Sequence, residues 1–323
     1  SVLALLSCSS SIRGPSSHPL VDDPMAFAGV TPQSARLIDP GDGSITALLN
    51  NLLQAMLVNP FKALAEMNVL GILVGAILFG LGLALTIKED SPINQIFSDL
   101  AQASYRIAGW VLTTLPLGLF AISYQLAGQI DFSTVTALAQ LAGVVFAATL
   151  FHGLVVLPFI AWWAAGLSPW KFFAAVSQPL VTALSTSSSA ATLPLSMATA
   201  ESKLGVDRAK CAFVLPLGAT ANMDGTALFE GIAAVFLAYM FGIDLSTTGI
   251  IAIFLVAMLS SVGAPGIPSG SMAGMQMVML AVGIPLEAIG LLLLIERPLD
   301  TFRTAVNVEG DLVGCLVAKR FTQ

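Results

Sequence analysis

Charged side chains are scarce in this sequence. Asp, Glu, Lys and Arg make up 10% of its 323 residues, whereas apolar residues make up 56%. A water-soluble domain carries about 25% charged residues, because it must cover its surface with them. The mean hydropathy of +0.88 and the long apolar runs therefore predict an integral membrane protein in a lipid bilayer. The net charge of −6 says little about partners, and we expect no nucleic acid among them.

Cysteine and histidine are also rare. The three cysteines are far apart and lack the spacing of a metal site, so we interpret them as small apolar residues without a disulfide framework. The two histidines, His18 and His152, lie outside the interrupted apolar segments described below. A serine hydrolase needs a general base beside its nucleophile, and neither histidine is placed for that role.

The first 44 residues differ from the apolar segments that follow. Residues 1–10, SVLALLSCSS, resemble the end of a lipoprotein signal but follow no basic leader, so we interpret them as the tail of a truncated transmembrane helix. Residues 11–44 are polar and rich in Pro, Gly and Ser, which predicts a loop. Because the sequence starts with Ser1, we expect a fragment or a processed chain.

Apolar segments fill the rest of the chain and are of two kinds. Those that look like ordinary membrane spans are 45–58, 63–87, 107–128 and 135–166. Those that contain a polar or Gly/Pro-rich interruption near the middle are 172–199, 211–241, 249–283 and 286–318. A bilayer tolerates such interruptions only where the freed backbone lines a protein-buried or watery site.

The basic residues predict which segments cross the membrane. Lys and Arg are absent from 107–170 and from 211–296. The remaining basic residues of the C-terminal half are Lys171, Lys203, Arg208, Lys210, Arg297, Arg303, Lys319 and Arg320. Because basic loops stay cytoplasmic, segment 172–199 is predicted to enter and leave on the cytoplasmic side, and segment 249–283 on the outer side. Two hairpins from opposite faces, each followed by a broken helix, form the inverted repeat of a transporter.

The two hairpin tips have different compositions. The first, LSTSSSAATLP (184–194), lets two short helices meet and leaves amide groups at a helix start, where an anion binds. Close packing of small residues explains this stretch slightly better when it is taken alone. The second tip, SSVGAPGIPSGS (260–271), contains three glycines and two prolines, which exclude a continuous membrane helix. Its apolar arms are too short for two spans, so a hairpin is favoured over an extramembrane loop.

The stretch NMDGT (222–226) places Asp224 inside an apolar segment. A bare buried carboxylate costs several kcal/mol or becomes protonated. A hard cation such as Na⁺ resolves this, with Asn222 and Thr226 adding neutral oxygens and Gly225 loosening the helix. A protonated Asp224 bonded to a neighbouring helix is the less favoured alternative, because Asp311 in NVEGD poses the same problem.

The last segment carries polar residues on one helix face. Asp300, Arg303, Asn307 and Asp311 follow one another at three- or four-residue steps. Arg303 offers a fork for a carboxylate and Asp300 a partner for an ammonium group. Internal pairing of Arg303 with Asp300 or Asp311 is the alternative, but with the broken tips nearby a ligand carrying both charges is favoured. Glu230, without Lys or Arg on its helix, is a candidate proton carrier, or else it faces water; the two readings are about equal.

These motifs together resemble the dicarboxylate/amino acid:cation symporter family, which includes the glutamate transporters. The matching stretches are STSSSAATLP, FVLPLGATANMDGTAL, SSVGAPGIP and LDTFRTAVNVEGD followed by LVAK. The resemblance runs from about Asn59 to the end of the chain. It implies an all-α integral membrane protein, an inverted-repeat elevator transporter with two re-entrant helical hairpins and two broken transmembrane helices. It further implies a homotrimer, multi-pass in the cell (plasma or inner) membrane.

The resemblance also implies a division of the chain and a set of site residues. Residues 1–44 would be the truncated end and polar loop, 45–166 scaffold-type transmembrane helices, and 167–323 the moving transport core. The substrate would contact Ser189, Thr226, Ile267, Asp300, Arg303, Thr304 and Asn307. Within this set, Asp300 would bind the amino group and Arg303 the side-chain carboxylate.

The coupling ions are implied in the same way, and no other cofactor is expected. One Na⁺ would lie among Gly218, Asn222, Asn307 and Asp311. A second would lie under the second tip, near Thr220, Met223, Ser261, Val262 and Ala264. A third would use Asn222 and Asp224. Glu230 stands where proton-cotransporting relatives have a glutamate.

Several positions depart from the family pattern. Family members begin with three further helices, which supply part of the third cation site and which we expect this chain to lack. Ser187 and Thr301 stand where some members have a second arginine, so Arg303 is the only basic group placed for a carboxylate. Ala264 and Pro265 replace commoner residues, which predicts a stiffer second tip.

The sequence therefore favours a secondary active symporter, not an enzyme, that couples uptake of aspartate or glutamate to Na⁺ and/or H⁺ gradients. A four-carbon dicarboxylate is the alternative substrate. A channel is one rival, which saturable, gradient-driven uptake would exclude. An intramembrane aspartyl hydrolase that pairs Asp224 with Asp311 is the rival from another class.

Overall fold

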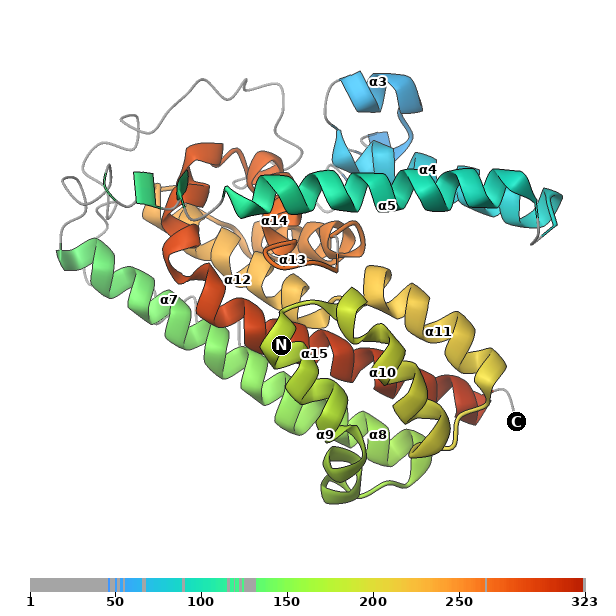
Figure 1. Cartoon of the computed structure of the whole chain (residues 1–323). Coiled ribbons are helices and arrows are strands. Elements are labelled where there is room, and N and C mark those ends of the chain that lie inside the picture. The colour runs from blue at the N-terminus through green and yellow to red at the C-terminus, as the bar shows by residue number, and fades with distance from the viewer. Residues whose placement is uncertain are drawn as a thin grey trace. The chain divides into compact units, whose positions relative to one another are not determined.

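The structure is a computed structural model (Figure 1), and all its regular elements are helical in the part of the chain that it describes. That part comprises residues 68–321, apart from 89–90, 115–116, 119, 122–123, 125–131 and 265, together with short stretches between 46 and 65. The predicted N-terminal region 1–44 and the predicted effect of Pro265 lie outside the described residues.

The chain divides into two compact units, of which Leu52–Phe132 is the smaller. Its helices are α3 (Pro60–Ala65), α4 (Val69–Thr86) and α5 (Pro92–Thr113). Asn68 caps α4, because its side-chain oxygen accepts a hydrogen bond from the Gly71 N–H at 3.1 Å. Helix α4 agrees with the segment predicted at 63–87. The segment predicted at 107–128 is wrong in its start, because α5 begins 15 residues earlier in a more polar stretch.

The second segment of the larger unit, from Ser133 on, opens with a long apolar helix. It consists of α7 (Phe132–Phe151), a π-helical turn η3 (His152–Val156) and α8 (Leu157–Ala165). Pro158 has no N–H to donate to the preceding turn, which accounts for the widening of the helix at that point. Gly166 ends α8 in the left-handed conformation, with φ 65°.

Two helical hairpins follow the predicted pattern. Helices α9 (Pro169–Thr186) and α10 (Ser189–Ser202) form hairpin 1. Helices α13 (Thr247–Val262) and α14 (Ser271–Val282) form hairpin 2, with residues 263–270 as its tip. Between them, α11 (Arg208–Ala221) and α12 (Asp224–Met240) are separated by two non-helical residues, Asn222 and Met223, so the break predicted in 211–241 is confirmed.

The break predicted in the last segment is wrong. After the short 3₁₀ turn η4 (Leu286–Ala288), α15 runs without interruption from Ile289 to Phe321. The polar residues of α15 have polar side chains, but its backbone hydrogen bonds continue past them. At the α11–α12 junction, by contrast, the helix itself is interrupted. Within α15, only Pro298 lacks a backbone N–H to donate. Packing of α15 against α8, α9, α11 and α12 keeps the helix continuous at this residue.

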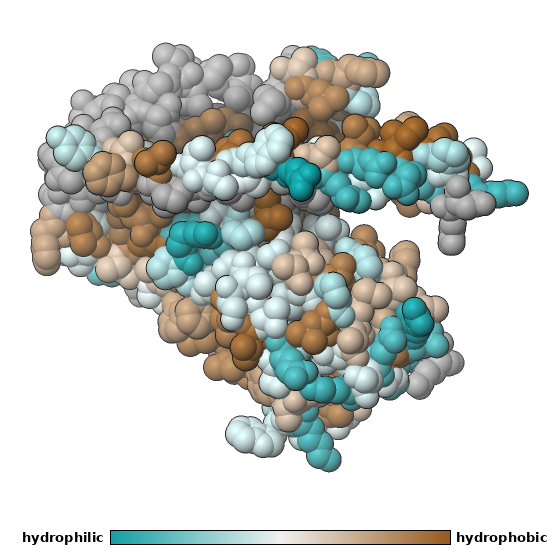
Figure 2. All heavy atoms as spheres, in the orientation of Figure 1, coloured by the Kyte–Doolittle hydropathy of each residue, from teal (hydrophilic) through white to brown (hydrophobic). Residues whose placement is uncertain are grey.

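Helix α15 lies at the centre of the larger unit (Figure 1). Its inner face joins a core of buried apolar side chains from α8 to α11, which includes Phe172, Leu215 and Leu312. Two stretches of the described residues are long and apolar enough to cross a membrane, Phe132–Ala165 and Arg208–Met240. The outer face of the first exposes large apolar side chains such as Phe151, Phe159 and Trp162, and Figure 2 shows brown, apolar spheres along this stretch. This is the surface expected of a helix in contact with lipid.

Candidate functional site

The junction between α11 and α12 lies against the middle of α15. Gly225 allows this close approach, since a Cβ atom there would lie 2.7 Å from the Arg303 carbonyl oxygen. The Gly225 N–H donates to Asn307 Oδ1 at 2.8 Å, and Asn307 Nδ2 donates to Thr226 Oγ1 at 3.2 Å. The polar residues predicted on α12 and on α15 are therefore brought together.

The residues predicted for the first sodium ion are also neighbours. Asn222 Nδ2 donates to Asp311 Oδ1 at 3.1 Å. That same carboxylate oxygen occupies the space of a missing side chain at Gly218, where a Cβ atom would lie 2.5 Å away. Asp311 is 4% exposed, and Asn307 lies one helical turn before it on α15. A carboxylate with neutral oxygens around it is the ligand type that hard cations prefer.

The residues predicted for the second sodium ion are not gathered as clearly. Met223 and Ala264 are buried, but Thr220 is exposed. The Thr220 hydroxyl donates to the Pro216 and Leu217 carbonyls of its own helix, and the Ser261 hydroxyl donates to the Met258 carbonyl. Val262 is the last residue of α13. The structure does not bring this set together, so the second sodium site stays a prediction.

The third predicted cation site has a partner that the sequence did not reveal. His152 Nε2 lies 3.2 Å from Asp224 Oδ2, and the two side chains are 18% and 24% exposed. The π turn η3 carries His152 to this position. The contact was missed because His152 stands in an uninterrupted apolar run, 72 residues from its partner.

The tips of the two hairpins meet at the candidate substrate site. The Ala190 N–H and the Ser188 hydroxyl both donate to the Gly266 carbonyl, at 3.2 and 2.8 Å. Next to this contact is a pocket lined by Ser187, Ser189, Met223, Thr226, Gly266, Ile267, Gly270, Ser271, Asp300, Thr304 and Asn307. All but one of the predicted substrate residues are in this lining, the exception being Arg303.

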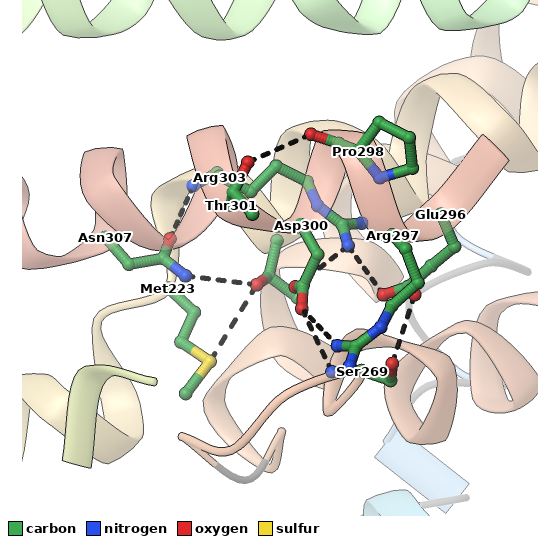
Figure 3. Close-up of polar contacts among 11 residues, drawn as sticks. Met223, Ser269, Glu296, Arg297, Pro298, Asp300, Thr301, Arg303 and Asn307 are labelled. Carbon is green, nitrogen blue, oxygen red and sulfur yellow. Dashed lines mark hydrogen bonds and ion pairs between the residues drawn. The ribbon is translucent and has the colours of Figure 1, made fainter. Parts of the chain in front are cut away.

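Arg303 lies beside the pocket and is 1% exposed. Its Nη2 donates to Glu296 Oε1 at 3.0 Å and to Asp300 Oδ1 at 3.1 Å, as Figure 3 shows. Its guanidinium stacks over the Phe229 ring at 4.1 Å. Nε and Nη1 are buried and have no partner among the described residues. The internal pairing with Asp300 that the sequence left open is thus present, and two donors of the fork remain for a ligand.

Glu296 is a functional residue that sequence reasoning missed. It is fully buried, seven residues before Arg303 on the same helix, and its carboxylate neutralises the arginine. The spacing of seven, two helical turns, was the available signal.

Two further buried carboxylates lack a basic partner in the described part of the chain. Glu230 is fully buried; Ser260 donates to its Oε2, and its Oε1 has no partner. It occupies space left by Gly274, where any side chain would overlap it. Glu309, which sequence reasoning also missed, is 3% exposed beside Gly153 and has an unpartnered Oε1. Uncompensated buried charge is costly, so these groups need a proton or a cation.

Comparison with known proteins gives a consistent result. The model of the sodium:dicarboxylate symporter family matches residues 27–321. The chain is 38% identical over 269 residues to a Caenorhabditis elegans protein assigned as the sodium-dependent excitatory amino acid transporter glt-4, covering 82% of this chain and 54% of that protein. It is 34% identical to human excitatory amino acid transporter 3 over 299 residues, covering 91% and 57%. Bovine excitatory amino acid transporter 1 is 34% identical over 297 residues, covering 88% and 55%. These relatives are transporters, not enzymes, and the chain spans about half of their length.

Proposed function

Because this chain belongs to the sodium:dicarboxylate symporter family, we propose that it forms the transport core of a secondary active symporter for an acidic amino acid, aspartate or glutamate. The relatives' names support an amino acid substrate. Na⁺ is the proposed coupling ion, and H⁺ is a further candidate.

The observation that carries the substrate class is the buried charge arrangement around Arg303. A buried guanidinium with an unpartnered Nε and Nη1 has N–H groups left to donate to a ligand carboxylate. Asp300, in the pocket lining, offers an acceptor to an ammonium group. Ser189 is the first residue of α10 and lies in the pocket lining, where the positive end of the helix dipole would stabilise a second carboxylate. Thr226, Ile267, Thr304 and Asn307 complete the proposed contacts.

The coupling ions would be transported together with the substrate. Asp311, with Gly218, Asn222 and Asn307, supplies the oxygen-rich set expected of a Na⁺ site, and its buried carboxylate would be neutralised by that ion. Asn222 with Asp224, and the second tip with Thr220, Met223, Ser261, Val262 and Ala264, remain proposed sites for further Na⁺ ions. Glu230 remains the proposed proton carrier, on the basis of its complete burial and its unpartnered oxygen.

The proposed mechanism is an elevator motion in a homotrimer of the cell membrane. The two hairpins and the α11–α12 junction, packed around α15, would move as one body, since they lie in one compact unit, which also contains α7 and α8. The hairpins would be re-entrant from opposite faces, as the distribution of Lys and Arg predicts.

Uptake by proteoliposomes of the full-length natural protein tests this function. Radiolabelled aspartate should accumulate when a Na⁺ gradient is imposed, and unlabelled glutamate should compete. A pH gradient imposed alone would measure the contribution of H⁺. If neither gradient drives saturable accumulation of aspartate or glutamate, the proposal is wrong.

A four-carbon dicarboxylate is the second candidate, supported by the description of the matching family. It would use the donors of Arg303 but would leave Asp300 without an ammonium partner. Succinate competing better than aspartate in the same assay would favour it.

A further inference from the structure

Ser269, in the tip of hairpin 2, has an unusual backbone conformation. Its φ is 61°, and the only other non-glycine residue with positive φ in the described chain is Ser187. Residues with a Cβ atom avoid this region because of steric strain, and they persist there only when their surroundings hold them. Contacts outside the tip must therefore hold Ser269.

Those contacts come from two carboxylates of α15. The Ser269 N–H donates to Asp300 Oδ2 at 3.1 Å, and the Ser269 hydroxyl donates to Glu296 Oε2 at 3.1 Å. The other oxygen of each carboxylate accepts from Arg303 Nη2. Figure 3 shows the result, in which Ser269 and Arg303 are bridged by the same two carboxylates. Hydrogen bonds to ionised acceptors are about twice as strong as neutral ones.

The tip that Ser269 holds covers the proposed substrate pocket. Gly266, Ile267, Gly270 and Ser271, on either side of Ser269, belong to the pocket lining. In this state the pocket is narrow and has room for about one water molecule between its lining side chains. An amino acid is several times larger, so the tip has to move before it can enter.

We propose that Ser269 is a positioning residue that latches the tip of hairpin 2 onto α15 and links closure of the pocket to the placement of Arg303. The link follows from the shared carboxylates. If Arg303 moves, Glu296 and Asp300 are released, and Ser269 loses both acceptors. Arg303 can keep Nη2 on the carboxylates while an unpartnered N–H, on Nη1 or on Nε, donates to a ligand carboxylate, so an acidic ligand preserves the latch. This consequence for transport rests on the proposed function, whereas the latch itself does not.

The test measures opening of the tip without any substrate. Ser271→Cys places a thiol in the pocket lining, and its rate of reaction with a membrane-impermeant methanethiosulfonate reports opening in the full-length protein. Ser269→Gly removes the hydroxyl while glycine keeps both the N–H and the φ of 61° without strain. We expect it to increase the labelling rate about tenfold, which is the value of one hydrogen bond to a charged acceptor.

Two further variants make the result specific. Ser185→Ala in hairpin 1 is the control, because its exposed hydroxyl bonds only the Val181 carbonyl of its own helix; we expect no change in labelling. In a Glu296→Gln background, where the acceptor of the hydroxyl is neutral, Ser269→Gly should accelerate labelling by less than in the parent.

The latch is wrong if Ser269→Gly leaves the labelling rate unaltered, or if Ser185→Ala raises it equally. Failure of the proposed function would be seen differently, as absence of aspartate uptake by the unmodified protein with the labelling pattern intact. With uptake present, Ser269→Gly should also speed the release of bound aspartate about tenfold.

Discussion

The two hairpin tips meet each other, yet they are held in different ways. The tip of hairpin 1 is two residues long, and Ser188 caps α10 by accepting from the Ala191 N–H at 3.1 Å. The tip of hairpin 2 has eight residues between its helices, and Ser269 bonds to α15 about 30 positions further along the chain. A local cap persists when neighbouring helices shift, whereas a long-range contact is lost. Hairpin 2 is therefore the tip suited to opening.

Replacement of Arg303 should have the largest effect on the difference in how the two tips are held. Arg303→Cys leaves Glu296 and Asp300 buried without their shared cation, a change that costs about 3–5 kcal/mol. We expect aspartate binding to weaken by more than about a hundredfold, measured by titration calorimetry in Na⁺. Arg297→Ala is the matched control: its side chain is 50% exposed and lies 3.8 Å from Asp300, so it should change affinity only slightly. Undiminished affinity in Arg303→Cys would contradict the role of Arg303.

A side chain at Gly266 should displace the tip of hairpin 2 from α11 and from hairpin 1. Its Cβ atom would lie 2.7 Å from the backbone oxygen of Ala219 on α11 and 3.4 Å from the backbone nitrogen of Ala190 in hairpin 1, and a backbone atom cannot turn away as a side chain can. We expect Gly266→Ala to reduce the initial rate of aspartate uptake about tenfold or more, because overpacking costs about 1–3 kcal/mol. Gly143→Ala on α7, where no atom lies within 4 Å, is the control and should retain the parental rate. Equal rates in both variants would show that this close packing of the tip is not needed for uptake.

Loss of the cap should have a moderate effect, mainly on hairpin 1. Ser188→Ala removes the acceptor for the Ala191 N–H and the donor to the Gly266 carbonyl. Removal of an N-cap costs about 1 kcal/mol. We expect the Tm in detergent to fall by a few degrees, while the labelling rate of Ser271→Cys rises less than with Ser269→Gly. A larger rise than with Ser269→Gly would reverse the assignment of the two tips.

The smallest effect is expected just outside the tip of hairpin 1. The Ser185 hydroxyl is exposed and bonds only the Val181 carbonyl of its own helix. Ser185→Ala should therefore change stability by less than about 0.5 kcal/mol. A drop in Tm as large as that of Ser188→Ala would mean that the hydroxyl-rich stretch acts as a whole and not through its cap.

The positions of these tips could be predicted because they depend on local backbone chemistry. Clustered glycine and proline at 263–270 and the sequence Asn-Met-Asp-Gly at 222–225 disfavour a continuous helix. The prediction of a break in α15 was wrong, because a series of polar side chains was taken as a sign of an interrupted backbone. Side-chain charge does not interrupt the backbone ladder, and a helix surrounded by other helices continues through it.

The partners of the site were harder to predict. His152 reaches Asp224 through a π turn, and Ser269 reaches Glu296 and Asp300 through a tip whose path depends on tertiary packing. Such contacts join segments far apart in the chain, and no local pattern encodes them. Arg303 and Asp300 were predictable as a pair because a helix fixes their spacing. Their additional neighbour Glu296 lies on the same helix face two turns earlier, and this spacing was overlooked.

The surplus of buried acids around α15 has an electrical consequence. Glu230, Glu309 and Asp311 lie below 5% exposure with no Lys or Arg partner among the described contacts, and Arg303 is already matched by two carboxylates. A core that moved while these groups were ionised would carry negative charge through the field of the membrane, where each elementary charge is worth about 2.3 kcal/mol per 100 mV. An inside-negative voltage would push such an unloaded core outward, and bound cations would cancel that force. The resting voltage of the cell would then set the direction in which the unloaded core returns.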